Sequence, residues 1–316
     1  MSAAEFDLVS HIRARVSGRV DVVLGIGDDA ALLQVPAGRQ LVVTADTLNA
    51  GVHFPEATAP ADIGWKSLAV NLSDLAAMGA TPAWCTLSLS LLQADEAWVD
   101  AFLDGFLALA ELHAISLVGG DTTRGPLSIA VTAMGLVEAG GAMRRDGARI
   151  GDDVWVTGTL GDAAAALDAW REGREVPAEL RQRLDRPIPR VSAGQHLSAL
   201  VHSCIDVSDG LLADLGHVCA RSGVGAEVQL TQLPASASLA AMEAAQRWHW
   251  QAAGGDDYEL CFTAAPRNRD LIVQALDFTG VSATRIGRVV AGQGVKAFGA
   301  EVREWKPVQS GYQHFL

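Results

Sequence analysis

The chain has 316 residues, of which 49% are hydrophobic and 19% charged, and this composition excludes a disordered protein and is typical of an ordinary globular one. The length suggests two domains of roughly 150 residues each. The 24 Lys and Arg residues against 37 Asp and Glu residues give a net charge of -13 without a basic patch, so we expect neither nucleic acid nor an anionic membrane as a partner.

The first half of the chain alternates between helical and strand-like segments. Residues 1–18 predict an amphipathic helix rather than a signal peptide, because charges interrupt apolar residues at helical spacing. A long helix is predicted to begin near Asp62 and to end before Gly79, and a second helix covers 96–113. Strands are predicted at 40–46, 84–92, 114–118 and 128–138, with a turn at 119–125.

The second half begins with a polar, glycine-containing joint, which places a domain boundary near residue 150 and divides the chain into domains 1–150 and 151–316. A strand at Asp153–Thr157, a turn at Gly158–Gly161 and a helix from Asp162 follow. The segment "CIDVSDGLLADLGHVCARSG" predicts a strand that leads into a helix ended by Gly223, and it faintly echoes "VNLSDLAAMG" of the first half. The alternation indicates a two-domain α/β (α+β) protein.

The four cysteines are far apart and lie in apolar contexts, without the spacing of a zinc site. We expect them to be reduced core thiols of a cytoplasmic protein. No apolar run approaches the length of a transmembrane helix.

Carboxylates recur at the ends of apolar segments, where α/β proteins bind ligands. Taken singly, Asp209 could cap the helix that follows it, and Asp46 could open a turn. Asp74 is harder to explain, because it lies three residues after Asn71 on one face of a helix. Neighbouring side chains of an extended segment point in opposite directions, so we expect Asp29 rather than Asp28 to point inward. The whole set is Asp28, Asp29, Asp46, Asp74, Asp121, Asp206, Asp209, Asp256 and Asp257.

These acids suit magnesium bound together with substrate phosphates, since a calcium loop with its regular acidic spacing is absent. The glycine turns "GGDTT" and "GTLGD" add backbone N–H groups that can bind anions. The chain contains neither a P-loop motif nor the catalytic motifs of protein kinases. The charge of a transferring phosphoryl group would therefore be met by metal ions and by Arg145.

Several ordered motifs resemble those of the thiamine-monophosphate kinase family, which belongs to a superfamily with aminoimidazole-ribonucleotide synthetase, selenophosphate synthetase and hydrogenase-maturation proteins. The resemblance covers nearly the whole chain. It is carried by the motifs "GIGDDAAL", "TADTLNAGVHF", "KSLAVNLSDLAAMGATP", "GGDTTRGP", "GARIGDDVWVTGTLGD", "IDVSDGLLADLGH" and "GGDDYELCFT".

The resemblance implies in-line transfer of the γ-phosphoryl group of ATP to thiamine monophosphate, the last step in making thiamine diphosphate. It also implies a two-domain synthetase-like fold in a homodimer, whose N-terminal mixed sheets pair into a β-barrel. Several magnesium ions are implied on Asp29, Thr44, the backbone of Ala45, Asp46, Asp74, Asp121, Asp206 and Asp209. Nucleotide contacts are implied for Gly120, Asp121, Arg145 and Ser208, and contacts to thiamine monophosphate for His53, Asp256 and Tyr312.

No general base is expected, because the acceptor phosphate has a second pKa of about 6 and is ionised at neutral pH. Three positions depart from the family pattern. Ala45 replaces a residue that often carries a hydroxyl, Asp256 stands where glutamate is usual, and the tail before Tyr312 is longer. Without the resemblance, His53 would be interpreted as a satisfied polar residue.

Three alternatives remain. One is a sister enzyme that uses ATP to activate an amide or carbonyl oxygen, although the chain lacks both an N-terminal cysteine and a cysteine-bearing tail. Another is a nucleotide-binding homologue without turnover. The third is that the acids form a solvated structural surface, which predicts nucleotide binding that does not depend on magnesium.

Overall fold

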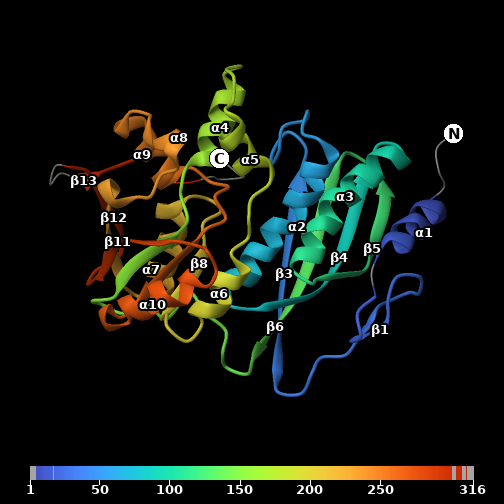
Figure 1. Ribbon diagram of the computed structural model, residues 1–316, viewed down its shortest axis with the longest axis horizontal. Coiled ribbons are helices and arrows are strands. Elements are labelled where there is room, and N and C mark those ends of the chain that lie inside the picture. Colours follow the sequence, from blue (N-terminus) through green and yellow to red (C-terminus); the bar gives the residue numbers. More distant parts are fainter. Residues whose placement is uncertain (1–4, 17, 301–303, 308–310, 312–316) are drawn as a thin grey trace. The chain divides into compact units, whose positions relative to one another are not determined.

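The structure is a computed structural model that describes residues 5–16, 18–300, 304–307 and 311 (Figure 1). The chain divides into two compact units, residues 1–75 with 80–140 and residues 76–79 with 141–316. The change of unit thus falls at Gly140, ahead of the joint that the sequence suggests near residue 150. Residues 76–79 belong to the second unit, where the Met143 N–H donates a hydrogen bond to the Met78 carbonyl oxygen at 3.1 Å and Gly194 lies close to the Ala76 carbonyl oxygen.

The N-terminal unit contains a four-stranded mixed sheet in the order β3-β6-β4-β5 and a small β1-β2 hairpin. The β3, β6 and β4 strands pair antiparallel, and β5 pairs parallel to β4 after the crossover through α3. Its elements are α1 (Glu5–Arg15), β1 (Val22–Leu24), β2 (Leu32–Leu33), β3 (Arg39–Asn49), α2 (Pro60–Ala77), β4 (Thr81–Leu91), α3 (Glu96–Leu112), β5 (Ser116–Arg124) and β6 (Ser128–Glu138). The helices and strands predicted for this half are therefore present.

The α2 and α3 helices lie side by side in this unit (Figure 1). Two glycines make their close contact possible. A Cβ on Gly105 would lie 1.7 Å from the Ala61 carbonyl oxygen, and a Cβ on Gly64 would lie 2.0 Å from that of Phe102. Side chains are excluded at both positions, so the helix backbones touch directly.

One expectation for this half is wrong. The sequence predicts a turn at 119–125, but β5 continues through Arg124 beside β4. Gly120 makes this pairing possible, because its φ is +146° and a Cβ there would lie 1.8 Å from the Leu87 carbonyl oxygen. Gly120 thus allows a close strand approach where the sequence suggests a change of direction.

The C-terminal unit contains a seven-stranded sheet in the order β13-β12-β9-β11-β7-β10-β8, with parallel pairing only between β12 and β9 among the described strands. Its strands are β7 (Asp153–Thr157), β8 (Ser203–Asp206), β9 (Gly225–Gln229), β10 (Leu260–Ala264), β11 (Ala283–Val290), β12 (Gly294–Phe298) and β13 (Glu304–Trp305). Its helices are α4 (Asp162–Arg171), α5 (Ala178–Asp185), α6 (Val191–Leu197), η1 (Leu230–Gln232), α7 (Leu211–Ser222), α8 (Ala237–Ala240), α9 (Ala244–Ala253), η2 (Pro266–Asn268) and α10 (Arg269–Asp277).

The main core of this unit lies between α7 and the sheet, where Leu215 and Val218 pack with Val156, Val228 and Ile286. The predicted strand at Asp153–Thr157 and the helix from Asp162 are confirmed. So is the helix end at Gly223, whose φ is +67° as expected of a left-handed cap.

The suggested internal echo does not correspond to a structural repeat. Ser73 and Asp74 lie inside α2, whereas Ser208 and Asp209 lie in the loop before α7. Asp209 is not a helix cap either, because the N-cap residue is Gly210 and no side chain caps the helix.

The four cysteines are buried and free, as expected of core thiols. Among the described residues, no helix is long and apolar enough to cross a membrane.

Candidate active site

In the N-terminal unit, β3 and α2 bring polar oxygens together. The Thr44 hydroxyl donates to the Asp74 carboxylate, and the Asp46 N–H donates to the Asn71 side-chain oxygen at 3.1 Å. Alternate residues of a strand share one face, and so do helix residues three apart. The Thr44 and Asp46 positions of β3 therefore meet the face of α2 that carries Asn71 and Asp74. The prediction that Asn71 and Asp74 share one face of a helix is confirmed, because both side chains of α2 contact β3. Asn71 is buried, and its amide donates to the Ser67 carbonyl oxygen at 3.0 Å, which orients its side chain.

Asp28 and Asp29 are both exposed, so the expectation that Asp29 points inward is wrong. An Asp28 carboxylate oxygen accepts a hydrogen bond from the Asp29 N–H at 2.8 Å. The preceding Gly27 has a φ of +118°. The segment is therefore a turn, in which the alternation of an extended strand does not apply.

Asp121 is exposed on β5 and lies opposite Ser88 of β4. Ser88 pairs with Ala130 of β6, and Ala130 pairs with Thr47 of β3, so these residues lie in one row across the sheet and their side chains share one face. Thr44 and Asp46 alternate with Thr47 along β3 and belong to the row whose side chains lie on the opposite face. Ala45 is exposed in the same row as Thr47. The unit thus brings Thr44, Asp46 and Asp74 together, and it places Asp121 in the other row.

No three His, Cys, Asp or Glu side chains in the described parts of the chain lie close enough together to hold a metal ion. The donor chemistry nevertheless fits magnesium, which takes one or two carboxylates and completes its octahedron with water and substrate phosphates. Thr44, Asp46 and Asp74 supply hard oxygen donors of that kind.

His53 lies in the loop after β3, and this loop is held to α2. The His53 Nδ1 accepts a hydrogen bond from the Asn49 N–H at 3.0 Å, so the proton of the neutral ring is on Nε2. The Lys66 Nζ, on a residue that is only 2% exposed, donates to the His53 carbonyl oxygen at 3.1 Å. Sequence reasoning missed Lys66; the signal was a lysine, one of three in the chain, within a helix full of apolar residues.

In the C-terminal unit, the loop 207–210 carries Ser208 and Asp209 and follows Asp206, the buried last residue of β8. One Asp214 carboxylate oxygen accepts the N–H groups of Ser208, Asp209 and Gly210 at 3.0, 3.1 and 3.1 Å. Burial, helped by the charge of Asp209, raises the pKa of Asp214 to about 7 against the effect of these three hydrogen bonds. Sequence reasoning missed this residue, which lies in the first turn of α7.

A second loop, 254–259, leads into β10 and runs beside the loop 207–210. The Asp256 N–H donates to the Ser208 carbonyl oxygen at 2.9 Å, and the Tyr258 N–H donates to that of Val207 at 2.8 Å. The Val207 N–H in turn donates to the Glu259 carbonyl oxygen at 2.8 Å. The structure therefore brings together Ser208 and Asp256, two sites that the sequence places far apart.

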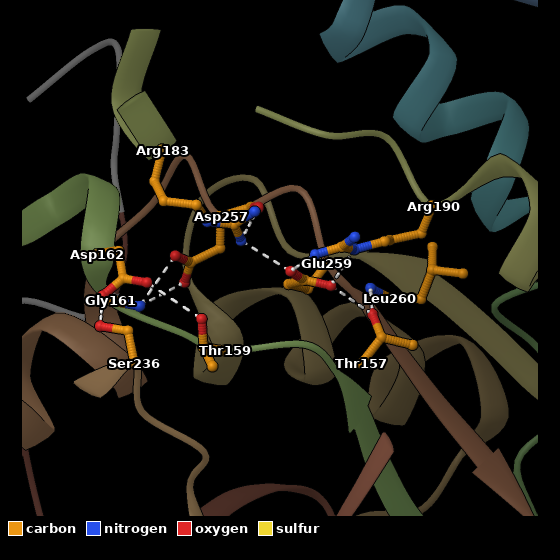
Figure 2. Close-up of polar contacts among 10 residues, drawn as sticks. All are labelled: Thr157, Thr159, Gly161, Asp162, Arg183, Arg190, Ser236, Asp257, Glu259 and Leu260. Atoms are coloured by element: carbon orange, nitrogen blue, oxygen red, sulfur yellow. Dashed lines mark hydrogen bonds and ion pairs between the residues drawn. The ribbon is translucent and has the colours of Figure 1, made fainter. Parts of the chain in front are cut away.

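Two acids of the second loop are buried in a polar cluster with charged partners (Figure 2). The Asp257 carboxylate accepts the Gly161 N–H with both oxygens, at 2.9 and 3.0 Å. Glu259 is completely buried and accepts hydrogen bonds from the Arg183 and Arg190 guanidinium groups and the Thr157 hydroxyl.

Their surroundings shift the pKa values of Asp257 and Glu259 in opposite directions. Burial raises the pKa of Asp257 well above its ordinary range, although the Gly161 N–H and the Arg183 charge oppose this. Burial would also raise the pKa of Glu259, but the charges and hydrogen bonds of Arg190 and Arg183 outweigh it and hold that pKa below its usual range. Glu259 is therefore a charged group inside the unit, neutralised by arginines.

The other predicted site residues lie as follows. Arg145 is exposed in the loop before β7, and its carbonyl oxygen accepts a hydrogen bond from the Ser222 hydroxyl at 3.0 Å. Gly120 is exposed in β5. Tyr312 lies outside the described residues.

Comparison with known proteins identifies relatives over the whole chain. The family model "AIR synthase related protein, N-terminal domain" matches residues 27–137, and the corresponding C-terminal domain matches residues 149–299. A thiamine-monophosphate kinase of Salmonella typhimurium is 46% identical, with 100% of this chain and 99% of that protein covered. One of Bacillus subtilis is 36% identical, with 90% and 91% covered.

Solved structures agree with these matches. The crystal structure of thiamine-monophosphate kinase from Stenotrophomonas maltophilia has a TM-score of 0.88 and 58% identity, with 94% of this chain and 97% of that one covered. AaThiL complexed with AMPPCP and TMP has a TM-score of 0.75 and 33% identity, with 95% and 96% covered. Escherichia coli HypE, a hydrogenase maturation protein, shares the fold at 20% identity and a TM-score of 0.77, with 98% and 99% covered.

Proposed function

The chain belongs to the thiamine-monophosphate kinase family, within the AIR synthase related proteins, and from this premise we propose that it transfers the γ-phosphoryl group of ATP to thiamine monophosphate, giving thiamine diphosphate and ADP. The observation that carries the proposal is the complex of AaThiL with AMPPCP and TMP, since that protein is similar over 95% of this chain. Both substrates are phosphorylated metabolites, which supports a cytoplasmic enzyme.

Magnesium ions carried with ATP would neutralise the charge of the triphosphate. We assign their protein ligands, from the family resemblance, to Asp29, Thr44, the Ala45 backbone, Asp46, Asp74, Asp121, Asp206 and Asp209. The contacts of β3 with α2 support this assignment, because the Thr44 hydroxyl and the Asp46 backbone are already oriented by α2 side chains. Donors held in place before the substrate arrives need little reorganisation during the reaction.

For the nucleotide we assign contacts to Gly120, Asp121, Arg145 and Ser208. His53 and Asp256 are assigned to thiamine monophosphate, with Tyr312 as a further contact in the tail. In the neutral tautomer set by Asn49, His53 can donate a hydrogen bond through Nε2. The attacking phosphate oxygen needs no base at neutral pH, so the chain's contribution is to position two anions and to neutralise their charge.

We also assign a homodimer in which N-terminal sheets of two copies pair into a barrel. The β3 strand supports this, because it is an eleven-residue strand at the edge of the sheet. Its Leu41 and Val43 side chains, on the face opposite Thr44, are 43% and 56% exposed. Long exposed edges with apolar side chains are normally covered. A Val43→Glu variant should sediment as a monomer, and an unchanged dimer mass would argue against this interface.

The proposed activity is tested by incubating the protein with ATP and magnesium and one acceptor at a time: thiamine monophosphate, thiamine or an aminoimidazole precursor. Thiamine diphosphate should form from the first acceptor alone. An Asp74→Asn variant should lose at least about 100-fold in kcat, the scale of removing one preorganised electrostatic contact. Asp104→Asn is the control, because Asp104 is exposed on α3 and pairs with Arg15. Magnesium-dependent ADP release with a different acceptor would instead assign the chain to a sister activity.

A further inference from the structure

The loop 254–259 has an unusual backbone. Among the described residues, three that are not glycine have a positive φ, and two of them are Asp256 at +68° and Tyr258 at +52°. Such a conformation costs free energy, most clearly for a bulky residue such as tyrosine, and it persists only where the surroundings impose it. Strain of this kind is concentrated at functional sites, so its supports need to be identified.

Side chains hold this backbone from inside the unit. Asp257, between the two strained residues, is buried and bound by both carboxylate oxygens to the Gly161 N–H. Glu259, directly after Tyr258, is bound by Arg183 at 2.7 Å and by Arg190 at 2.6 and 2.5 Å (Figure 2). The loop is therefore anchored on both sides of Tyr258.

Backbone hydrogen bonds hold the loop from the other side. The N–H groups of the two strained residues, Asp256 and Tyr258, are the ones that bind the carbonyl oxygens of Ser208 and Val207. A Cβ on Gly255 would lie 2.4 Å from the Ser208 carbonyl oxygen, so this close approach also requires a glycine. The position of Asp256 relative to the loop 207–210 is thus set by the backbone itself.

Within this frame, the Tyr258 side chain turns back to Asp256. Its hydroxyl donates a hydrogen bond to Asp256 Oδ1 at 2.9 Å, and Tyr258 is buried while Asp256 is half-buried. A hydrogen bond to one oxygen restricts rotation of the carboxylate. The restriction matters because aspartate has a short side chain, so a misdirected carboxylate has little freedom to recover contact with a ligand.

We propose that Tyr258 is a positioning residue for substrate recognition, whose hydroxyl holds the Asp256 carboxylate in the orientation that accepts a hydrogen bond from thiamine monophosphate. This inference rests on the proposed function, in which Asp256 contacts that substrate. Glu259 and its two arginines maintain the strained backbone on which the Tyr258 to Asp256 contact depends.

The test is Tyr258→Phe, which removes the hydroxyl and keeps the buried ring. We expect the KM for thiamine monophosphate to rise about tenfold, the scale of one hydrogen bond to a charged group, with kcat and the KM for ATP nearly unchanged. In an Asp256→Ala background the same substitution should have no further effect on KM, since the group that it positions is already gone.

Ser203→Ala is the matched control, because it also removes a buried hydroxyl group. The Ser203 hydroxyl of β8 lies 2.7 Å from the Thr263 hydroxyl of β10, the strand that follows the loop of Tyr258. The control should lower the unfolding midpoint without changing either KM, and kinetics are run well below each variant's midpoint. An unchanged KM for thiamine monophosphate in Tyr258→Phe, or an equal rise in both KM values, would overturn the positioning role. If the unmodified protein makes no thiamine diphosphate, the proposed function fails first and the inference fails with it, which is a distinguishable result.

Discussion

Replacing Glu259 by glutamine is the sharpest test of how the C-terminal unit is held together. Glu259 is completely buried, with guanidinium nitrogens of Arg183 and Arg190 at 2.7, 2.6 and 2.5 Å and the Thr157 hydroxyl at 2.7 Å. Glutamine has nearly the same shape but no charge, and its amide group would face donors. Two largely buried guanidinium groups would lose their counter-charge, so we expect a loss of about 3–5 kcal/mol in the free energy of unfolding.

The assay is urea denaturation at pH 7, with Glu227→Gln as the control. Glu227 pairs with Arg288 at 2.7 Å on the surface, where an ion pair is worth only about 0–1 kcal/mol. If Glu259→Gln loses no more free energy of unfolding than the control, Glu259 is not a buried charge that stabilises the unit through its arginines. Each variant removes one carboxylate charge, so the difference between their losses in the free energy of unfolding measures the effect of burying the ion pair.

The pH dependence has a definite sign. Because the folded-state pKa of Glu259 lies below its usual value, its ionised form stabilises the folded unit above the unfolded pKa of about 4.3. This contribution is lost as the pH falls through the lower folded-state pKa. The stability difference between the unmodified protein and Glu259→Gln should therefore be constant above about pH 5 and shrink below it.

Other substitutions test local features by thermal or urea denaturation. Asp214→Ala should lower the free energy of unfolding by about 1–3 kcal/mol, because three backbone N–H groups lose their acceptor. Asp214→Asn keeps a side-chain oxygen and should lose much less, so equal losses in the two variants would contradict this role. Gly105→Ala should cost about 1–3 kcal/mol or more, because its Cβ would overlap the Ala61 carbonyl oxygen. Gly216→Ala, inside α7 with nothing within 4 Å of a Cβ, should instead stabilise by up to about 1 kcal/mol, and a loss there would refute the helix-propensity argument.

The secondary structure of the N-terminal unit, with β7, α4, β8 and α7 of the C-terminal unit, was largely predictable from local patterns. Helical spacing and end signals located α2 between Asp62 and Gly79, and alternation with turn residues located β6 and β7. The prediction failed at 119–125, where Gly120, one of a pair of glycines that usually marks a turn, instead allows β5 to approach β4. A glycine permits both conformations, and only the neighbouring strand decides between them.

The candidate site was predictable in part. The helical spacing of Asn71 and Asp74 indicated a shared face, and β3 lies against that face. The motifs also indicated Ser208 and Asp256 but not that their loops run side by side, nor that Asp29 is exposed in a turn. The side chains that hold the site residues in place, such as Lys66 and Asp214, carry no motif of their own in the sequence.

The sequence by itself determined the main helices and strands of the N-terminal unit, the elements β7, α4, β8 and α7 of the C-terminal unit, the family, and which carboxylates are candidates, because periodicity, turn chemistry and motifs act over a few neighbouring residues. Only the tertiary structure decided which groups support them. Glu259 meets Arg190 and Arg183 across 69 and 76 residues of chain. A charged side chain has the same local signal whether it is solvated or buried, and its role depends on burial and on partners that the fold brings from distant parts of the chain.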